Sequence, residues 1–193
     1  MSVKEMCLAA LMAAVLCVVG PFSIPVGPIP LSLATLVIYL TAYILGWKLG
    51  VVSVLIYLLV GILGVPVFSA GRSGIGVIAG PTGGYLIGYL LLVLICGLFV
   101  GPGETLGRSA TSKPGSKKAR MILASILVMV VATAVLYTLG TVWLAYSAHM
   151  TAKAAIAAGV LPFLAGDAIK IVIAAFLGSA LQGRLRSAGL IQA

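Results

Sequence analysis

Two residues of opposite charge lie close together inside the last apolar run of the chain. In the string Gly166-Asp167-Ala168-Ile169-Lys170 the acid and the base are three residues apart, so both lie on one face of a helix. They are therefore able to contact one bound molecule together. A pair that only neutralises itself is the alternative. An ionisable residue within a membrane span is costly, however, and usually marks a substrate or ion path, which favours a functional role.

A second group of candidate contacts lies in a glycine-rich stretch. It combines Ser69-Ala70-Gly71-Arg72-Ser73-Gly74 with Gly80-Pro81-Thr82-Gly83-Gly84-Tyr85. Glycines let backbone N–H groups approach a ligand closely, and the forked guanidinium of Arg72 suits a carboxylate. The alternative is that Arg72 is an ordinary surface charge.

The composition predicts that these candidates are held by helices in a membrane. Hydrophobic residues make up 62% of the chain and charged residues 8%, which excludes a soluble domain with a polar surface. The apolar residues form continuous runs and do not alternate with polar ones, which favours transmembrane helices over a β-barrel. We expect an all-α membrane protein in which residues 1–193 form a single transmembrane substrate-binding domain.

Six apolar runs predict six transmembrane helices. They are Met6 to Val19, Leu31 to Leu45, Gly50 to Leu63, Thr82 to Val100, Met121 to Tyr146 and Leu161 to Leu181. The second and third runs are short for a full crossing, so four spans with two re-entrant segments is the alternative.

The basic residues predict the orientation of these spans. With six spans and an inner N-terminus, the inner segments hold Lys4, Lys48, Arg108, Lys113, Lys117, Lys118, Arg120, Arg184 and Arg186. The outer loops hold only Arg72 and Lys153. Because Lys and Arg near span ends collect on the cytoplasmic side, both termini should be cytoplasmic, with Gly101 to Ala119 as an inner linker. This bias accounts for the net charge of +9 without nucleic acid.

Three predicted outer segments lie on one side of the membrane: Gly20 to Pro30, Gly64 to Gly84 and Ser147 to Lys170. Irregular backbone near membrane depth is tolerated where it is buried in protein or lines a cavity. Such long loops in a small protein indicate a lidded pocket, with ordinary connecting loops as the alternative.

Other motifs bear on energy supply, partners and metals. The sequence contains no GxxxxGK[ST] string, so it does not hydrolyse ATP through a P-loop of its own. Ala9 and Ala13, with Ala10 and Ala14 beside them, form a small-xxx-small pattern that lets another helix approach closely, either a partner's or one from the same bundle. The spacing of Cys7, Cys17 and Cys96 does not favour a metal site.

At this point four strings resemble one known family. They are Gly27-Pro28-Ile29-Pro30-Leu31-Ser32-Leu33, Gly64-Val65-Pro66-Val67-Phe68, Gly80-Pro81-Thr82-Gly83-Gly84-Tyr85-Leu86 and Gly166-Asp167-Ala168-Ile169-Lys170. In order and spacing the chain resembles the BioY proteins, the biotin-specific S components of energy-coupling factor (ECF) transporters. The combination of GPTGGYL with a later GDxxK is what makes the resemblance specific.

The resemblance implies a six-helix S-component bundle in a prokaryotic cytoplasmic membrane. Such a bundle binds biotin from the outside and docks, through its first helix, onto a transmembrane coupling subunit served by two ATPase subunits. It implies that Ala9, Ala13, Ala10 and Ala14 form the docking face. Biotin is then the transported ligand, and no cofactor or metal is expected.

Biotin also suits the candidate residues chemically. Its ureido ring offers N–H donors and a carbonyl acceptor to Asp167 and Lys170, and its carboxylate suits Arg72. The expected substrate-binding residues are Asp167, Lys170, Tyr85, Arg72, Thr82, Gly83, Phe68 and Ser73. The remaining alternatives are an S component for another vitamin, a small membrane-embedded enzyme that uses Asp167, Lys170 or His149, and a scaffold subunit. We expect a binding subunit, with no catalytic residue.

Overall fold

The protein is a bundle of long helices. The structure, a computed structural model, describes residues 3–25, 29–102 and 114–189. Its long helices are α1 (Val3–Val19), α2 (Ala34–Ile62), α4 (Gly83–Val100), α6 (Pro114–Ser147) and α8 (Leu161–Ser187). The short elements are β1 (Ser23–Pro25), β2 (Pro30–Ser32), the 3-10 turn η1 (Ser69–Gly71), α3 (Ile75–Ala79) and α7 (Ala152–Gly159).

The predicted apolar runs lie in these helices. Gly50 to Leu63 follows Leu31 to Leu45 within one helix, because α2 contains both runs. Gly27 and Pro28 of the proline-rich string and residues 103–113 of the predicted linker lie outside the described residues. The helical class is therefore confirmed, with the small addition of a two-stranded antiparallel hairpin in which Ile24 pairs with Leu31.

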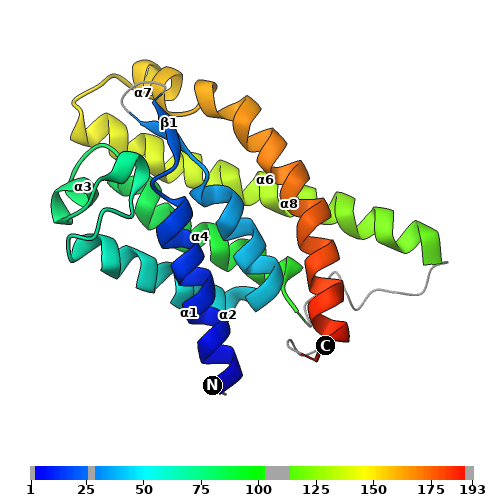
Figure 1. The fold of residues 1–193 in the computed structure, drawn as a ribbon. Coiled ribbons are helices and arrows are strands. Elements are labelled where there is room, and N and C mark those ends of the chain that lie inside the picture. The colour runs from blue at the N-terminus through cyan, green and yellow to red at the C-terminus, as the bar shows by residue number, and fades with distance from the viewer. Residues whose placement is uncertain (1–2, 26–28, 103–113, 190–193) are drawn as a thin grey trace.

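A break at Gly46 divides α2 into two arms. Gly46 has φ 69° and ψ −168°, a backbone conformation that side chains with a Cβ rarely adopt. Figure 1 shows the two arms running in different directions. This break explains why one helix supplies two short apolar runs that read as separate spans in the sequence.

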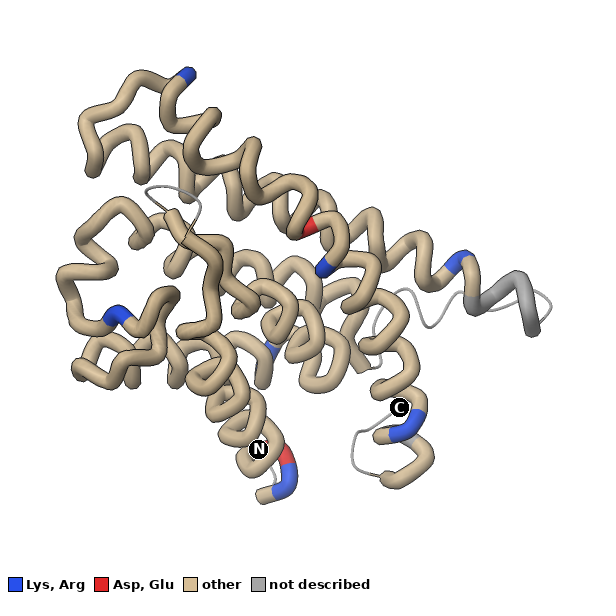
Figure 2. Tube along the Cα trace, turned by 45° about the horizontal axis from the view of Figure 1, so that its top comes forward, with Lys and Arg blue, Asp and Glu red and all other residues tan. Residues whose placement is uncertain are grey.

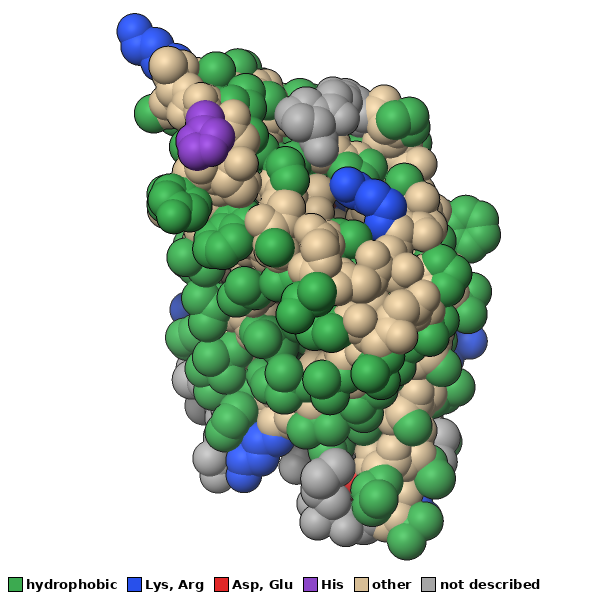
Figure 3. Space-filling model, turned by 90° about the vertical axis from the view of Figure 1, so that its left-hand side faces the viewer, with side chains coloured by type: hydrophobic (Ala, Val, Ile, Leu, Met, Phe, Trp, Pro, Cys, Tyr) green, Lys and Arg blue, Asp and Glu red, His purple; other side chains and the backbone are tan. Residues whose placement is uncertain are grey.

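The outer surface of the bundle is apolar around its middle. Figure 3 shows a nearly continuous band of hydrophobic side chains, with Lys and Arg above and below it. Within the described residues, four helical stretches are long and apolar enough to cross a membrane: Ala34–Ile62, Gly83–Val100, Ala119–Ser147 and Ala152–Leu185, the last of which joins α7 to α8. Exposed side chains such as Leu127 and Phe176 suit a lipid environment and not water.

Charges in the long helices gather at helix ends and at the break in α2, with one exception. Figure 2 shows an acidic and a basic position close together inside a helix. Asp167 and Lys170 belong to α8 and lie away from both of its ends. The beginning of α1 and the end of α8 lie at the same end of the bundle (Figure 1). The β-hairpin, α3 and α7 lie toward the other end.

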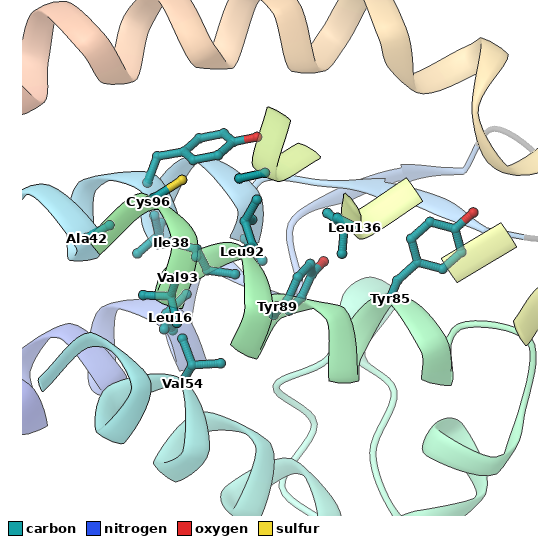
Figure 4. Close-up of a cluster of buried hydrophobic side chains, with 14 of the residues drawn as sticks. Leu16, Ile38, Ala42, Val54, Tyr85, Tyr89, Leu92, Val93, Cys96 and Leu136 are labelled. Atoms are coloured by element: carbon teal, nitrogen blue, oxygen red, sulfur yellow. The ribbon is translucent and has the colours of Figure 1, made fainter. Parts of the chain in front are cut away.

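Close packing between helices forms the core around these charges. Leu16, Ile38, Val54 and Leu92 are among the fully buried side chains, and Figure 4 shows how they converge from several helices. The aromatic ring of Tyr85 packs so tightly against α6 that a Cβ at Gly140 would collide with it. The core therefore holds α4 and α6 at a fixed distance beside the polar residues of α8.

Candidate functional site

A buried ion pair lies at the centre of the candidate site. The Nζ atom of Lys170 is 2.9 Å from Oδ1 of Asp167, and the two residues are three positions apart on α8. Their exposed fractions are 6% and 5%. Because two buried charges lose their hydration, such a pair is retained only when further hydrogen bonds satisfy it.

Residues from two other parts of the chain supply those hydrogen bonds. The ammonium of Lys170 donates to the carbonyl oxygen of Ser32 at 2.6 Å and to Oγ1 of Thr35 at 3.2 Å. Thr35 donates to Oδ1 of Asp167 at 3.4 Å, and the hydroxyl of Tyr137 donates to Oδ2 at 2.6 Å. The pair thus ties α8 to the start of α2 and to α6.

A cavity opens beside this cluster, with an empty volume of about 480 Å³ that includes its mouth. Its walls come from β2, the start of α2, η1, the first half of α4, the later part of α6 and the first half of α8. The polar lining residues are Ser32, Thr35, Ser69, Thr82, Tyr85, Tyr89, Tyr137, Asp167 and Lys170. The remaining walls are apolar, as a molecule with a hydrocarbon body requires.

Four of the residues predicted to contact substrate line this cavity: Asp167, Lys170, Tyr85 and Thr82. Tyr85 lines it with its ring, because its hydroxyl donates to the carbonyl oxygen of Gly159 at 2.9 Å. The hydroxyl of Thr82 donates to the carbonyl oxygen of Val77 at 3.3 Å. The structure therefore brings together the acid–base pair and the start of α4, which lie far apart in sequence.

The other four predicted residues lie outside the cavity lining. Phe68 is 1% exposed and packs edge-on against Tyr57, with ring centroids 5.6 Å apart, so it serves the core. Gly83 is buried where a Cβ would collide with the backbone of Ile78. Ser73 is half-buried in the loop before α3. None of these three residues belongs to the cavity lining, so their contact with a ligand stays a prediction.

Arg72 lies one contact behind the rim of the cavity. Its Nε donates to the carbonyl oxygen of Ser69 at 3.3 Å, and Ser69 lines the cavity. Arg72 itself is half-buried and is not part of the lining. Its guanidinium is therefore close to the loop that borders the mouth, although it does not form a wall.

Six polar or aromatic lining residues are not among the expected substrate-binding residues, although one of them, Ser69, belongs to the glycine-rich stretch: Ser32, Thr35, Ser69, Tyr89, Tyr137 and Phe163. Two of them follow a helical spacing that is visible in the sequence, since Tyr89 is four residues after Tyr85 and Phe163 is four before Asp167. Tyr137 has no such signal, because α6 is apolar along most of its length.

The two halves of the alanine pattern on α1 differ in exposure. Ala9 and Ala13 are each 2% exposed, and the hydroxyl of Ser53 on α2 donates to the carbonyl oxygen of Ala9 at 2.9 Å. This half of the pattern packs inside the bundle, which is the alternative that the sequence left open. Ala10 and Ala14 are exposed, and docking through this helix stays a prediction.

Comparisons with known proteins first define the class of fold. The chain superposes on a solved structure described as the S-component for biotin from an ECF-type ABC transporter, with a TM-score of 0.80 and 24% sequence identity. The match covers 94% of this chain and 92% of the other. The protein thus has the fold of a transporter S component.

The sequence comparisons give the family. The BioY family model matches residues 1–187, and the chain belongs to the BioY family. A probable biotin transporter BioY of Pyrococcus horikoshii is 36% identical over 183 residues, covering 95% of this chain and 99% of that protein. The biotin transporter BioY of Thermotoga maritima is 33% identical over 179 residues, covering 93% and 96%.

Proposed function

We propose that this chain captures biotin in the cavity beside Asp167 and Lys170, as the S component of an ECF-type transporter. The observation that carries the proposal is the buried ion pair, which lines a cavity that also has apolar walls. Biotin, like the cavity, has a polar part and an apolar part, because a polar ring urea lies at one end of an apolar body. Membership of the BioY family and the names of the relatives support biotin over other vitamins and a transport role over catalysis.

The ring urea is the part of biotin that the deep charges recognise. Asp167 accepts hydrogen bonds from the ureido N–H groups, and Lys170 holds the carboxylate in place through its 2.9 Å contact with Oδ1. The ring and chain carbons of biotin pack on Leu86, Leu136 and Phe163, which line the cavity. Recognition thus combines one charged contact with the burial of apolar surface.

The carboxylate of biotin points toward the mouth of the cavity. Ser69 on η1 and the start of α4 line that part, and Arg72 is bonded to Ser69 from behind. The N-terminus of an 18-residue helix carries partial positive charge, which favours an anion there.

The chain crosses the cytoplasmic membrane six times in this account, with both termini in the cytoplasm. Each of the two arms of α2 then forms one crossing. The shared location of the beginning of α1 and the end of α8 supports an even number of crossings (Figure 1). Energy for uptake comes from a coupling subunit and two ATPase subunits, and the exposed Ala10 and Ala14 of α1 meet the coupling subunit.

Competition against radiolabelled biotin tests the proposed substrate. Purified, ligand-stripped protein should retain labelled biotin, and unlabelled biotin or desthiobiotin should displace it, because both contain the ring urea. Thiamin and riboflavin should leave it bound. Displacement by thiamin or riboflavin, or failure of desthiobiotin to compete, would contradict the assignment of the ring urea to the ion pair.

A further inference from the structure

Tyr89 presents a hydroxyl group that the protein itself does not use. Its side chain is 6% exposed and lines the cavity from α4, one helical turn after Tyr85. Figure 4 shows the two rings leaving α4 on the same side. Tyr85 donates its proton to the carbonyl oxygen of Gly159, whereas no hydrogen bond to Tyr89 is found in the part of the chain that the structure describes.

The free hydroxyl faces the space of the cavity. Among the described residues, every side-chain nitrogen or oxygen that is fully enclosed has a hydrogen-bond partner. The hydroxyl of Tyr89 has none, so it keeps contact with open space, and the cavity is the space that this residue lines. A phenylalanine would fill the same volume without a polar group to satisfy, so the unused hydroxyl indicates a partner that is not protein.

The other hydrogen-bond donors around the cavity are nearly all in use. The protons of Thr35, Thr82, Tyr85 and Tyr137 go to protein acceptors. The Ser32 hydroxyl donates to the carbonyl oxygen of Gly20, and the three protons of Lys170 go to Ser32, Thr35 and Asp167. Among the side chains of the described lining, this leaves the hydroxyl groups of Tyr89 and Ser69 as free donors.

The elements that carry these two donors distinguish them. Tyr89 lines the cavity from the inside of the long helix α4, six residues after Gly83, where the helix begins. Asp167 and Lys170 likewise line it from the inside of the long helix α8. Ser69 belongs to η1, outside the long helices. Tyr89 is therefore the free side-chain donor that shares the helical part of the cavity wall with the ion pair.

We propose that Tyr89 is a specificity-determining residue whose hydroxyl donates a hydrogen bond to the carbonyl oxygen of the ligand's ring urea. This inference rests on the proposed function and adds to it. A cyclic urea needs acceptors for its two N–H groups and a donor for its carbonyl. Asp167 supplies acceptor oxygens, and Tyr89 supplies the donor that Lys170, with its protons engaged, does not.

Tyr89→Phe tests this inference when biotin is compared with 2-thiobiotin, in which a weakly accepting sulfur replaces the ureido oxygen. One neutral hydrogen bond changes affinity by about fivefold. We expect Tyr89→Phe to weaken biotin binding by about that factor and to change 2-thiobiotin binding far less. The ratio of the two dissociation constants should therefore shrink toward one.

Tyr85→Phe is the matched control, because it removes a hydroxyl from the same helix face that is already bonded to Gly159. It should change the affinity for both ligands by the same factor. Equal losses for both ligands in Tyr89→Phe, or no loss for either, would overturn the role of Tyr89. Absence of biotin binding in the unmodified protein would instead overturn the proposed function, so the two failures are distinguishable.

Discussion

The hydroxyl of Tyr137 on α6 lies 2.6 Å from Oδ2 of Asp167 on α8 and donates a hydrogen bond to it. The other oxygen of the carboxylate is 2.9 Å from the ammonium of Lys170. Asp167 is thus held from both sides, by a cation of its own helix and by a neutral donor of a second helix. This arrangement fixes the direction in which the carboxylate faces the cavity.

Tyr137→Phe should weaken biotin binding by about tenfold, because a hydrogen bond to a charged group is lost and the carboxylate is free to turn. Equilibrium titration of the purified variant measures the effect. Tyr146→Phe is the control, since Tyr146 is also on α6 but is 76% exposed. Equal affinities in the two variants would show that Tyr137 does not position Asp167.

Lys170→Met should lower the stability of the folded protein by about 3–5 kcal/mol, because it leaves the carboxylate of Asp167 buried without its counter-ion. Thermal melting of the detergent-solubilised protein measures this loss. The same substitution at Lys153, which is exposed on α7, should leave the melting temperature unchanged. A Lys170→Met protein as stable as Lys153→Met would contradict the ion pair.

Gly46→Ala should destabilise the fold by about 1–3 kcal/mol, because the break in α2 needs a positive φ that alanine adopts only under strain. Gly183→Ala in α8 is a suitable control, since a Cβ there meets no atom within 4 Å and alanine favours a helix. The melting temperatures of the two variants should differ clearly. A neutral Gly46→Ala would mean that the two arms of α2 do not depend on this break.

Replacing Ala10 and Ala14 together by leucine should separate docking from binding. Both residues are exposed on α1, so biotin affinity should remain while co-purification with the coupling subunit falls by at least tenfold. Leucine at Ala157, which is exposed on α7, should leave both properties intact. Normal co-purification of the double variant would exclude this face of α1 from the docking surface.

Much of the fold could be predicted because lipid restricts the choice of structure. The long apolar runs had to be helices, and all six predicted runs begin or end within a few residues of a helix end. The break at Gly46 could not be predicted, because Trp47 and Lys48 read as a polar loop between two spans, although the helix resumes directly after the glycine. Hydropathy does not distinguish a loop from a bend.

The sequence predicted those site residues whose type or local sequence string indicates a chemical role. Asp167 and Lys170 are recognisable because charges are rare in apolar runs, and Tyr85 and Thr82 because they belong to a specific string. Phe68 is buried in the core and does not line the cavity, so its contact with a ligand stays a prediction, because an aromatic residue in a loop packs in a core as readily as on a ligand. Tyr137 was missed because its role depends on how α6 packs on α8, which no local pattern encodes.

The alanine pattern of α1 shows the same limit. Small residues at a spacing of four predict that some helix approaches closely, but they do not say which one. The structure shows that α2 takes the place beside Ala9, where Ser53 donates to the backbone. Only the residues on the other side of α1 remain available to a partner.

The most direct test of the whole account is a calorimetric titration of the purified, ligand-stripped protein with biotin, alongside the Asp167→Ala variant. We predict saturable one-to-one binding by the unmodified protein and an affinity at least tenfold weaker in the variant, because the carboxylate is the acceptor for the ring urea. Biotin binding of equal strength in both proteins would remove Asp167 from the site. No binding by a well-folded unmodified protein would contradict biotin capture itself.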